Sequence, residues 1–136
     1  MRRGQATITA VEAGIGILLV LALSVAFALG SPGGADQAST AQLDAYAEDA
    51  GTILAQEQPR HADQTRLAEI TASQAAFERE ATALERRIEE ILPENTLFRL
   101  DTPHGSVGHP LPTDVHTGTA TIPTTTRPVT LNVWYV

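Results

Sequence analysis

The sequence predicts an α+β protein with an N-terminal transmembrane helix, two further helices arranged as a hairpin or stalk, and a small C-terminal antiparallel β-meander. Three observations predict this fold class. Residues 13–30 form an uncharged apolar run, residues 65–92 place apolar side chains at helical spacing, and residues 93–136 are rich in threonine, valine, proline and glycine. The part of the 136-residue chain that follows residue 30 is long enough for one modest hydrophobic core.

The apolar run predicts a membrane-spanning helix. As an α-helix, residues 13–30 would extend about 27 Å, close to the hydrocarbon core of about 30 Å. Arg2 and Arg3 precede the run without a balancing acid, and positively charged flanks stay in the cytoplasm. We therefore expect a single-pass protein of the cell membrane, with residues 1–12 in the cytoplasm, residues 13–30 in contact with membrane lipid, and the C-terminal domain outside the cell.

Two further interpretations of the N-terminal segment stay open. The sequence from Ala26 to Ala28 matches the small-x-small site of a cleaved signal peptide, which would make the protein a secreted one. The stretch from Arg2 to Glu12 instead resembles the leader of haloarchaeal type IV pilin-like, or pseudopilin-like, small membrane proteins. In that family a short basic leader is cut just ahead of a polar residue, often glutamine, and the apolar helix follows directly. The resemblance places the cut between Gly4 and Gln5.

The resemblance also gives Glu12 a role, although the register differs from the family pattern. The family usually has an acid at the fifth mature position, whereas a cut after Gly4 puts Thr9 there and Glu12 at the eighth. In pilins the equivalent acid is thought to pair with the N-terminal amine of a neighbouring subunit. The alternative is that Glu12 lies at the membrane interface and reaches water there.

A hinge and a first extramembrane helix follow. Residues 31–38 contain the strongest helix-breaking cluster of the chain, Ser-Pro-Gly-Gly, and predict a hinge. Ser39 and Gln42 have the spacing of a capping box, which predicts that the helix over residues 39–57 begins at Ser39.

Residues 65–92 predict the longest amphipathic helix of the helical region, which covers residues 39–92. Its apolar side chains alternate spacings of three and four, as in a heptad seam, and Pro93 stops the helix. The preceding helix, folded back across residues 58–64, is the nearest cover for the seam, and an intermolecular coiled coil is the alternative. The charged residues between positions 78 and 90 are interpreted as a solvated face. The seam consists of Leu67, Ile70, Gln74, Phe77, Ala81, Leu84, Ile88 and Ile91.

The C-terminal region, residues 93–136, predicts three strands. Residues 96–101, 115–122 and 129–136 have strand composition, and residues 102–114 are interpreted as a loop. We expect these strands to form an antiparallel sheet with one face on the amphipathic helix, burying Phe77 and Leu84.

The sequence offers little for catalysis or cofactor binding. It has no cysteine, which excludes disulfides and thiolate sites. His104, His109 and His116 fall close together, but their spacings match no compact metal motif, and His61 stands alone. The glutamates between positions 78 and 90 lie on an exposed helix rather than in a cleft that would separate their pKa values. We expect no catalytic residue, no metal, no cofactor and no small-molecule substrate.

The charge pattern excludes nucleic acid and indicates an environment. A net charge of −7 and an aromatic content of 4 % argue against phosphate binding and base stacking. All nine basic residues are arginine, and the acids outnumber them. Molar salt would screen the resulting self-repulsion, so the pattern favours a halophilic protein.

These observations together predict a non-enzymatic single-pass membrane protein. The resemblance implies a pilin-like structural or assembly subunit of an archaeal surface filament or secretion-type system. The alternatives are a membrane-anchored extracellular binding or adaptor protein, and a secreted protein with a cleaved signal peptide.

Overall fold

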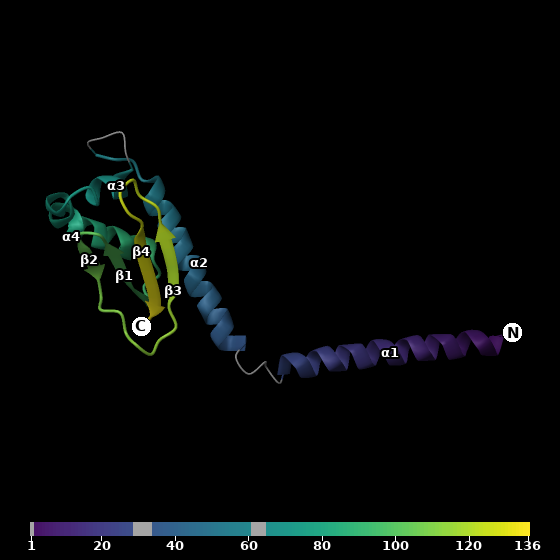
Figure 1. Ribbon diagram of the computed structural model, residues 1–136. Coiled ribbons are helices and arrows are strands. Elements are labelled where there is room, and N and C mark those ends of the chain that lie inside the picture. The colour runs from purple at the N-terminus through teal and green to yellow at the C-terminus, as the bar shows by residue number, and fades with distance from the viewer. Residues whose placement is uncertain (1, 29–33, 61–64) are drawn as a thin grey trace. The chain divides into compact units, whose positions relative to one another are not determined.

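The computed structural model describes residues 2–28, 34–60 and 65–136, and in the first range it describes the side chains of residues 10–25. The described residues form four helices followed by four strands (Figure 1). They divide into two compact units, residues 1–35 and residues 36–136.

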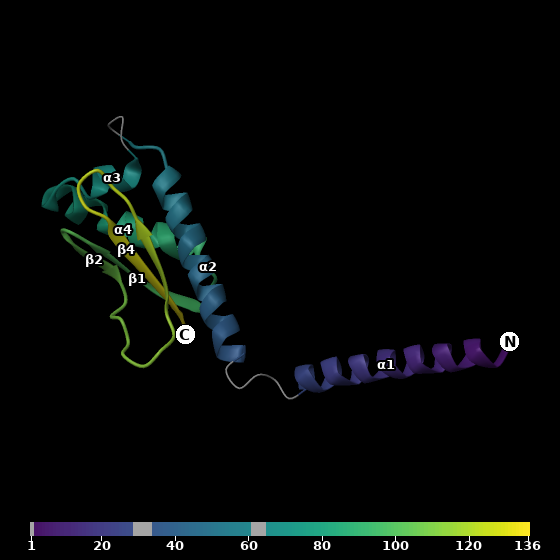
Figure 2. The same ribbon diagram turned by 45° about the vertical axis from the view of Figure 1, so that its right-hand side comes forward.

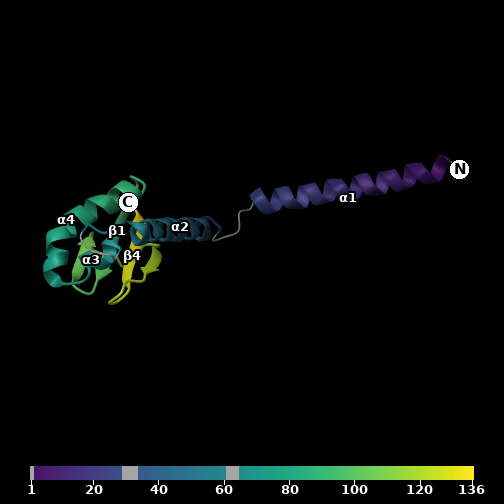
Figure 3. The ribbon, with the colours of Figure 1, turned by 90° about the horizontal axis from the view of Figure 1, so that it is seen from above.

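The first unit consists mainly of helix α1, Arg2–Ala28 (Figure 3). Among the described residues, no helix is both long and apolar enough to cross a membrane, so the predicted transmembrane helix over residues 13–30 is wrong. The physical reason is the length of the uncharged part. It begins at Ala13 and α1 ends at Ala28, which gives about 24 Å of helix against a hydrocarbon core of about 30 Å. Extension toward the N-terminus brings in the charge of Glu12.

Helix α2, Gly34–Gln56, begins earlier than the capping box predicts. Ser39 and Gln42 lie inside the helix, and the Thr40 hydroxyl donates a 2.8 Å hydrogen bond to the carbonyl of Asp36. Asp36 places a carboxylate in the first turn, where the helix dipole favours negative charge. The last residues of the predicted hinge, 34–38, are therefore helical, and residues 31–33 lie outside the described residues.

The predicted helix over residues 65–92 is divided into two helices, α3, Arg66–Ile70, and α4, Gln74–Ile91. The buried Thr71 ends α3 by donating its hydroxyl to the carbonyl of Leu67 at 2.8 Å. Ser73 caps α4, because its hydroxyl oxygen accepts a 3.1 Å hydrogen bond from the Ala76 amide. Side-chain hydroxyls that bond to nearby backbone groups compete with a continuous helix, and this local competition interrupts the heptad seam.

The sheet has four strands, β1, Thr96–Thr102, β2, Gly105–Gly108, β3, Gly118–Ile122, and β4, Val129–Tyr135. Their order is β2-β1-β4-β3, and all neighbours are antiparallel. The three predicted strands are therefore confirmed as β1, β3 and β4 of one antiparallel sheet. The predicted three-stranded β-meander is wrong, because β2 adds a fourth strand and β1 pairs with β4. Two hairpins, β1–β2 and β3–β4, join through the central pair of β1 and β4, in which Phe98 lies opposite Val133.

Strand β2 lies in the segment that was interpreted as a loop. Its sequence, Gly-Ser-Val-Gly, has a single buried apolar residue, Val107, and no alternation that would identify a strand. Gly108 has φ of +96°, and a Cβ there would lie 2.3 Å from the carbonyl oxygen of Phe98. Only glycine adopts this backbone conformation freely, so these glycines belong to the hairpin and do not mark an irregular loop.

One face of the sheet and the three helices of the second unit share a single hydrophobic core. The inward residues of β1 and β4, among them Leu100 and Leu131, are fully buried. Phe77 and Leu84 are buried in the same core, which confirms the expected contact between the amphipathic helix and the sheet. The buried members of the heptad seam are therefore covered within one chain. They are Leu67, Ile70, Phe77, Leu84 and Ile88.

Helix α2 lies beside the edge strand β3 in both side views (Figures 1 and 2). At Gly118 the approach is so close that a Cβ would lie 2.1 Å from the carbonyl carbon of Leu43. One residue later, the Thr119 amide donates a 3.1 Å hydrogen bond to the Asp44 carboxylate. This contact protects part of an edge whose backbone groups would otherwise be open to another strand.

Candidate functional site

Two features of the described residues have no role in packing the core, and the first is the surface of α1. Large apolar side chains along this helix are 52–69 % exposed. Residues 17–21 are consecutive and all apolar, and because one helical turn takes 3.6 residues, they cover every side of the helix. The exposed residues are Val11, Ile15, Ile17, Leu18, Leu19, Val20, Leu21, Leu23 and Val25.

The residues that the sequence singled out for processing and assembly all lie on α1. Gly4 and Gln5 are within the helical backbone, so the peptide bond between them is part of α1. Glu12 lies further along the same helix with an exposed side chain. The structure does not bring Glu12 together with another of these residues, because Gly4 and Gln5 are two turns away along the helix axis.

The second feature is a chain of ion pairs that links the end of α2 with α3 and α4. Glu57, which follows α2, accepts a hydrogen bond from Nε of Arg87 on α4. The other Glu57 oxygen lies 3.5 Å from Nη1 of Arg66, and these two carboxylate and guanidinium groups are each 17 % exposed. Glu57 therefore pairs with two arginines from different helices. The charged run between positions 78 and 90 is not simply the solvated face that the sequence indicated.

The hydrogen bond between Arg87 and Glu57 changes the pKa of Arg87. The hydrogen bond from Arg87 to Glu57, followed by the charge of Glu57, raises the pKa of the Arg87 guanidinium above its ordinary range. Arginine is already protonated throughout the physiological range, so this pair holds its charges at any pH at which the carboxylate is ionised.

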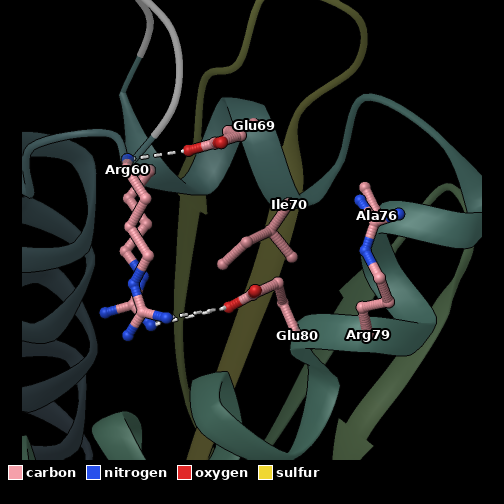
Figure 4. A pocket seen from close by; sticks show the side chains of 7 residues that line it. Arg60, Glu69, Ile70, Ala76, Arg79 and Glu80 are labelled. Carbon is pink, nitrogen blue, oxygen red and sulfur yellow. Dashed lines mark hydrogen bonds and ion pairs between the residues drawn. The ribbon is translucent and has the colours of Figure 1, made fainter.

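The chain of ion pairs continues into a pocket of about 280 Å³ between the segment after α2, α3 and α4 (Figure 4). Glu80 lies 3.9 Å from Nη1 of Arg60 and 3.8 Å from Nη2 of Arg66, and so it serves two guanidinium groups. The Arg60 amide donates a 2.9 Å hydrogen bond to the Glu69 carboxylate. We call this the arginine pocket. It is lined by Arg60, Arg66, Glu69, Ile70, Ala76, Arg79 and Glu80.

Sequence reasoning did not find the arginine pocket. Its members come from positions 60 to 80, where the arginines are spaced irregularly and form no motif. The fold brings them together because the break at Thr71 lets α3 and α4 face each other across the pocket. The local pattern that indicates the break between α3 and α4 is the pair of hydroxyl residues Thr71 and Ser73.

The described histidines do not form a metal site. His104 follows β1, His109 follows β2 and His116 precedes β3, while His61 lies outside the described residues. In the parts of the chain that the structure describes, no group of three or more histidine or acidic side chains is placed to hold a metal ion.

Tyr135, at the end of β4, has a perturbed hydroxyl. Partial burial, and after it the neighbouring Tyr46, raises the pKa of the Tyr135 hydroxyl above its ordinary value of 10.0. Tyr46 in turn accepts a 2.6 Å hydrogen bond from the side-chain amide of Gln42. This polar cluster connects α2 with the end of the sheet.

The raised pKa of Tyr135 predicts a loss of stability at alkaline pH. The unfolded chain loses this proton first, so the free energy of unfolding is expected to be constant up to about pH 10 and to fall as the pH rises through the folded-state pKa. Because the chain has no lysine and no cysteine, few other groups titrate in this range. Urea unfolding between about pH 8 and about pH 11 measures the fall, which Tyr135→Phe should reduce. An equal fall in Tyr135→Phe would contradict the assignment.

The fold and these features define a small α+β protein with an apolar-coated N-terminal helix and an arginine-lined pocket in its second unit. The chain belongs to the family of unknown function DUF7262, whose model matches residues 2–135. No curated protein and no solved structure is significantly similar to the chain.

Proposed function

We propose that the protein is a non-enzymatic structural subunit that assembles with further copies of itself through α1, in the manner of a pilin-like subunit. The observation that supports the proposal is the apolar coat of α1, which covers all sides of the helix. A helix that is apolar on every side is stable only when it is surrounded by other apolar groups.

The coat favours several neighbours over a single partner helix. A two-stranded coiled coil covers one stripe of each helix and leaves the remaining faces in water. In α1 the side chains of Leu18, Leu19 and Val20 point to different sides, because successive residues are about 100° apart around the helix, and each is more than half exposed. Copies of α1 packed side by side would cover all these faces, with each copy offering an apolar helix of matching length.

The charges of the chain are consistent with such a bundle. Glu12 is the only ionisable residue between positions 4 and 30, and a carboxylate that becomes buried requires a counter-charge. The counter-charge comes from a neighbouring copy that is displaced along the helix axis. In the unprocessed chain it is Arg2 and Arg3, and after removal of the leader it is the amino group of Gln5. The second unit carries most of the negative charge, which keeps the heads of such an assembly hydrated and apart.

Sedimentation velocity of the full chain in detergent-free buffer tests the proposal. We expect the wild-type protein to sediment as a large oligomer and Leu18→Glu to sediment as a monomer. A carboxylate in the bundle costs several kcal/mol, which raises the dissociation constant at least about a hundredfold. Leu111→Glu is the matched control, because Leu111 is an exposed leucine outside α1 and its substitution should leave the oligomer intact. A wild-type monomer, or a monomer that floats with lipid vesicles, would contradict the assembly.

The mass of the mature protein tests the processing step separately. A chain that begins at Gln5 supports a pilin-like leader. A chain that begins at Met1 is compatible with assembly through α1 but contradicts a cleaved leader. A chain that begins at Leu29 has lost α1 and would overturn the proposed function.

A further inference from the structure

We propose that the arginine pocket binds a small aliphatic carboxylate, with the carboxylate on the guanidinium group of Arg66 and the hydrocarbon part against Ile70. The pocket belongs to the second unit, and the proposal does not depend on assembly through α1.

The charge of the pocket favours an anion although the whole protein is acidic. The chain has a net charge of −7, yet the arginine pocket has three arginines and two glutamates among its lining residues. Two other grooves of the second unit have acidic residues and no arginine in their lining. The groove between α2 and β3 has Glu48, and the groove between the end of α4 and β1 has Glu89 and Glu94. Glu57 pairs with Arg66 from outside this lining, so the three arginines face three carboxylates, and an anion meets less repulsion here than over the rest of the acidic surface.

One hydrogen-bond donor of the pocket, in the side chain of Arg66, also lacks an acceptor among the described residues. Nε of Arg66 is buried, and within the described part of the chain it has no hydrogen-bond partner. The distances from Glu80 to Arg60 and Arg66, 3.9 and 3.8 Å, are too long for hydrogen bonds. A buried donor without an acceptor is rare in native proteins, and a carboxylate that binds Nε and Nη of one guanidinium side by side would supply the missing acceptor.

Arg79 provides a second cation for the ligand. Figure 4 shows Arg79 and Arg60 on opposite sides of the pocket, with Ile70 and Glu80 between them. Among the described residues, Arg79 has no ion pair and no side-chain hydrogen bond, in contrast to Arg60 and Arg66. Its guanidinium is therefore available to an anion without the loss of a structural contact.

The size and the wall of the pocket restrict the ligand. A volume of about 280 Å³ is at the lower end of the range for ligand sites, about 300–1,000 Å³, and suits a molecule with a short chain. Ile70 and Ala76 are buried apolar residues and form a wall without polar groups. An inorganic anion would leave this wall unused, whereas the alkyl group of a carboxylate would cover it.

Backbone-amide NMR titrations of the full chain with formate, acetate, propionate and butyrate, at constant ionic strength, test the ligand class. We expect saturable shifts of residues in α3 and the first turns of α4, with the affinity increasing about fourfold for each added methylene group that is buried. An affinity that is independent of chain length would overturn the apolar wall as part of the site. Tighter binding of inorganic phosphate than of butyrate would overturn the carboxylate class.

Two variants that each remove one positive charge separate a specific site from general attraction. Arg79→Gln is expected to weaken butyrate binding about threefold, through the loss of a positive charge across the pocket from the carboxylate, without changing the amide spectrum elsewhere. Arg127→Gln removes an exposed arginine from the connection between β3 and β4 and should leave the affinity unchanged. Equal affinities of the two variants, or shifts that do not saturate in the wild type, would overturn the proposal.

Discussion

Replacement of Gly118 by alanine is expected to lower the free energy of unfolding by about 3 kcal/mol, because the new methyl group has no space. Its carbon would lie 2.1 Å from the carbonyl carbon and 2.2 Å from the carbonyl oxygen of Leu43, and 2.4 Å from the Asp44 amide nitrogen. These are backbone atoms of a regular helix, so no rotation of a side chain relieves the clash. Strand β3 must move away from α2, which also breaks the hydrogen bond from Thr119 to Asp44. Urea unfolding of the full chain, followed by circular dichroism, measures the change.

Gly51→Ala is the matched control on the opposite side of the same contact. A Cβ at Gly51 would meet a side-chain atom of Ile122 at 3.2 Å, and a side chain can shift by a few tenths of an ångström. Alanine also gains about 1 kcal/mol of helix propensity over glycine within α2. We expect the two effects to offset each other to within about 1 kcal/mol. A Gly118→Ala protein as stable as Gly51→Ala would show that β3 does not pack this closely against α2.

Leu131→Ala is expected to destabilise the protein by about 3–4 kcal/mol, through lost burial and the cavity that the smaller side chain leaves. Leu131 is 0 % exposed in the middle of β4, and its neighbours across the two flanking strands are Leu100 and Ala120. A central strand bonded on both sides has little freedom to move into the cavity, so we do not expect a cost at the low end of the usual range of about 2–5 kcal/mol. Urea unfolding measures this loss of stability. The dependence of the free energy of unfolding on urea concentration should stay the same if the unfolded state is unaffected.

Leu111→Ala removes the same atoms from a surface position and is the control for Leu131→Ala. Leu111 is 45 % exposed in the connection between β2 and β3, so truncation should change the free energy of unfolding by less than about 1 kcal/mol. A similar loss in both variants would contradict the assignment of Leu131 to the centre of the core.

The secondary structure of the second unit followed from the sequence where the side-chain pattern was strong. Alternation in residues 129–136 identified β4, and the 3,4-spacing around Phe77 and Leu84 identified the helix face that meets the sheet. The prediction was wrong where a local signal competed with packing. The capping box at Ser39 lies inside α2, and the hydroxyl residues at the α3–α4 break, not proline or glycine, interrupt the long helix.

The candidate sites were accessible to sequence reasoning to different degrees. The apolar coat of α1 is visible in the sequence, because every side of a helix is apolar when consecutive residues are. The arginine pocket is not visible, because Arg60, Arg66 and Arg79 have no common period and meet only after α3 and α4 turn toward each other.

The sequence by itself determined the order of helices before strands, the apolar character of α1, and the faces of α4 and β4 that enter the core. These properties depend on the period of the side chains along one element, which neighbours in sequence fix. Only the tertiary structure decided the strand order β2-β1-β4-β3, the approach of β3 to α2 at Gly118, and the pairing of Glu57 with Arg66 and Arg87. Each of these features joins residues far apart in the chain or depends on the space between elements. The spacing of side chains along one element does not predict either of them.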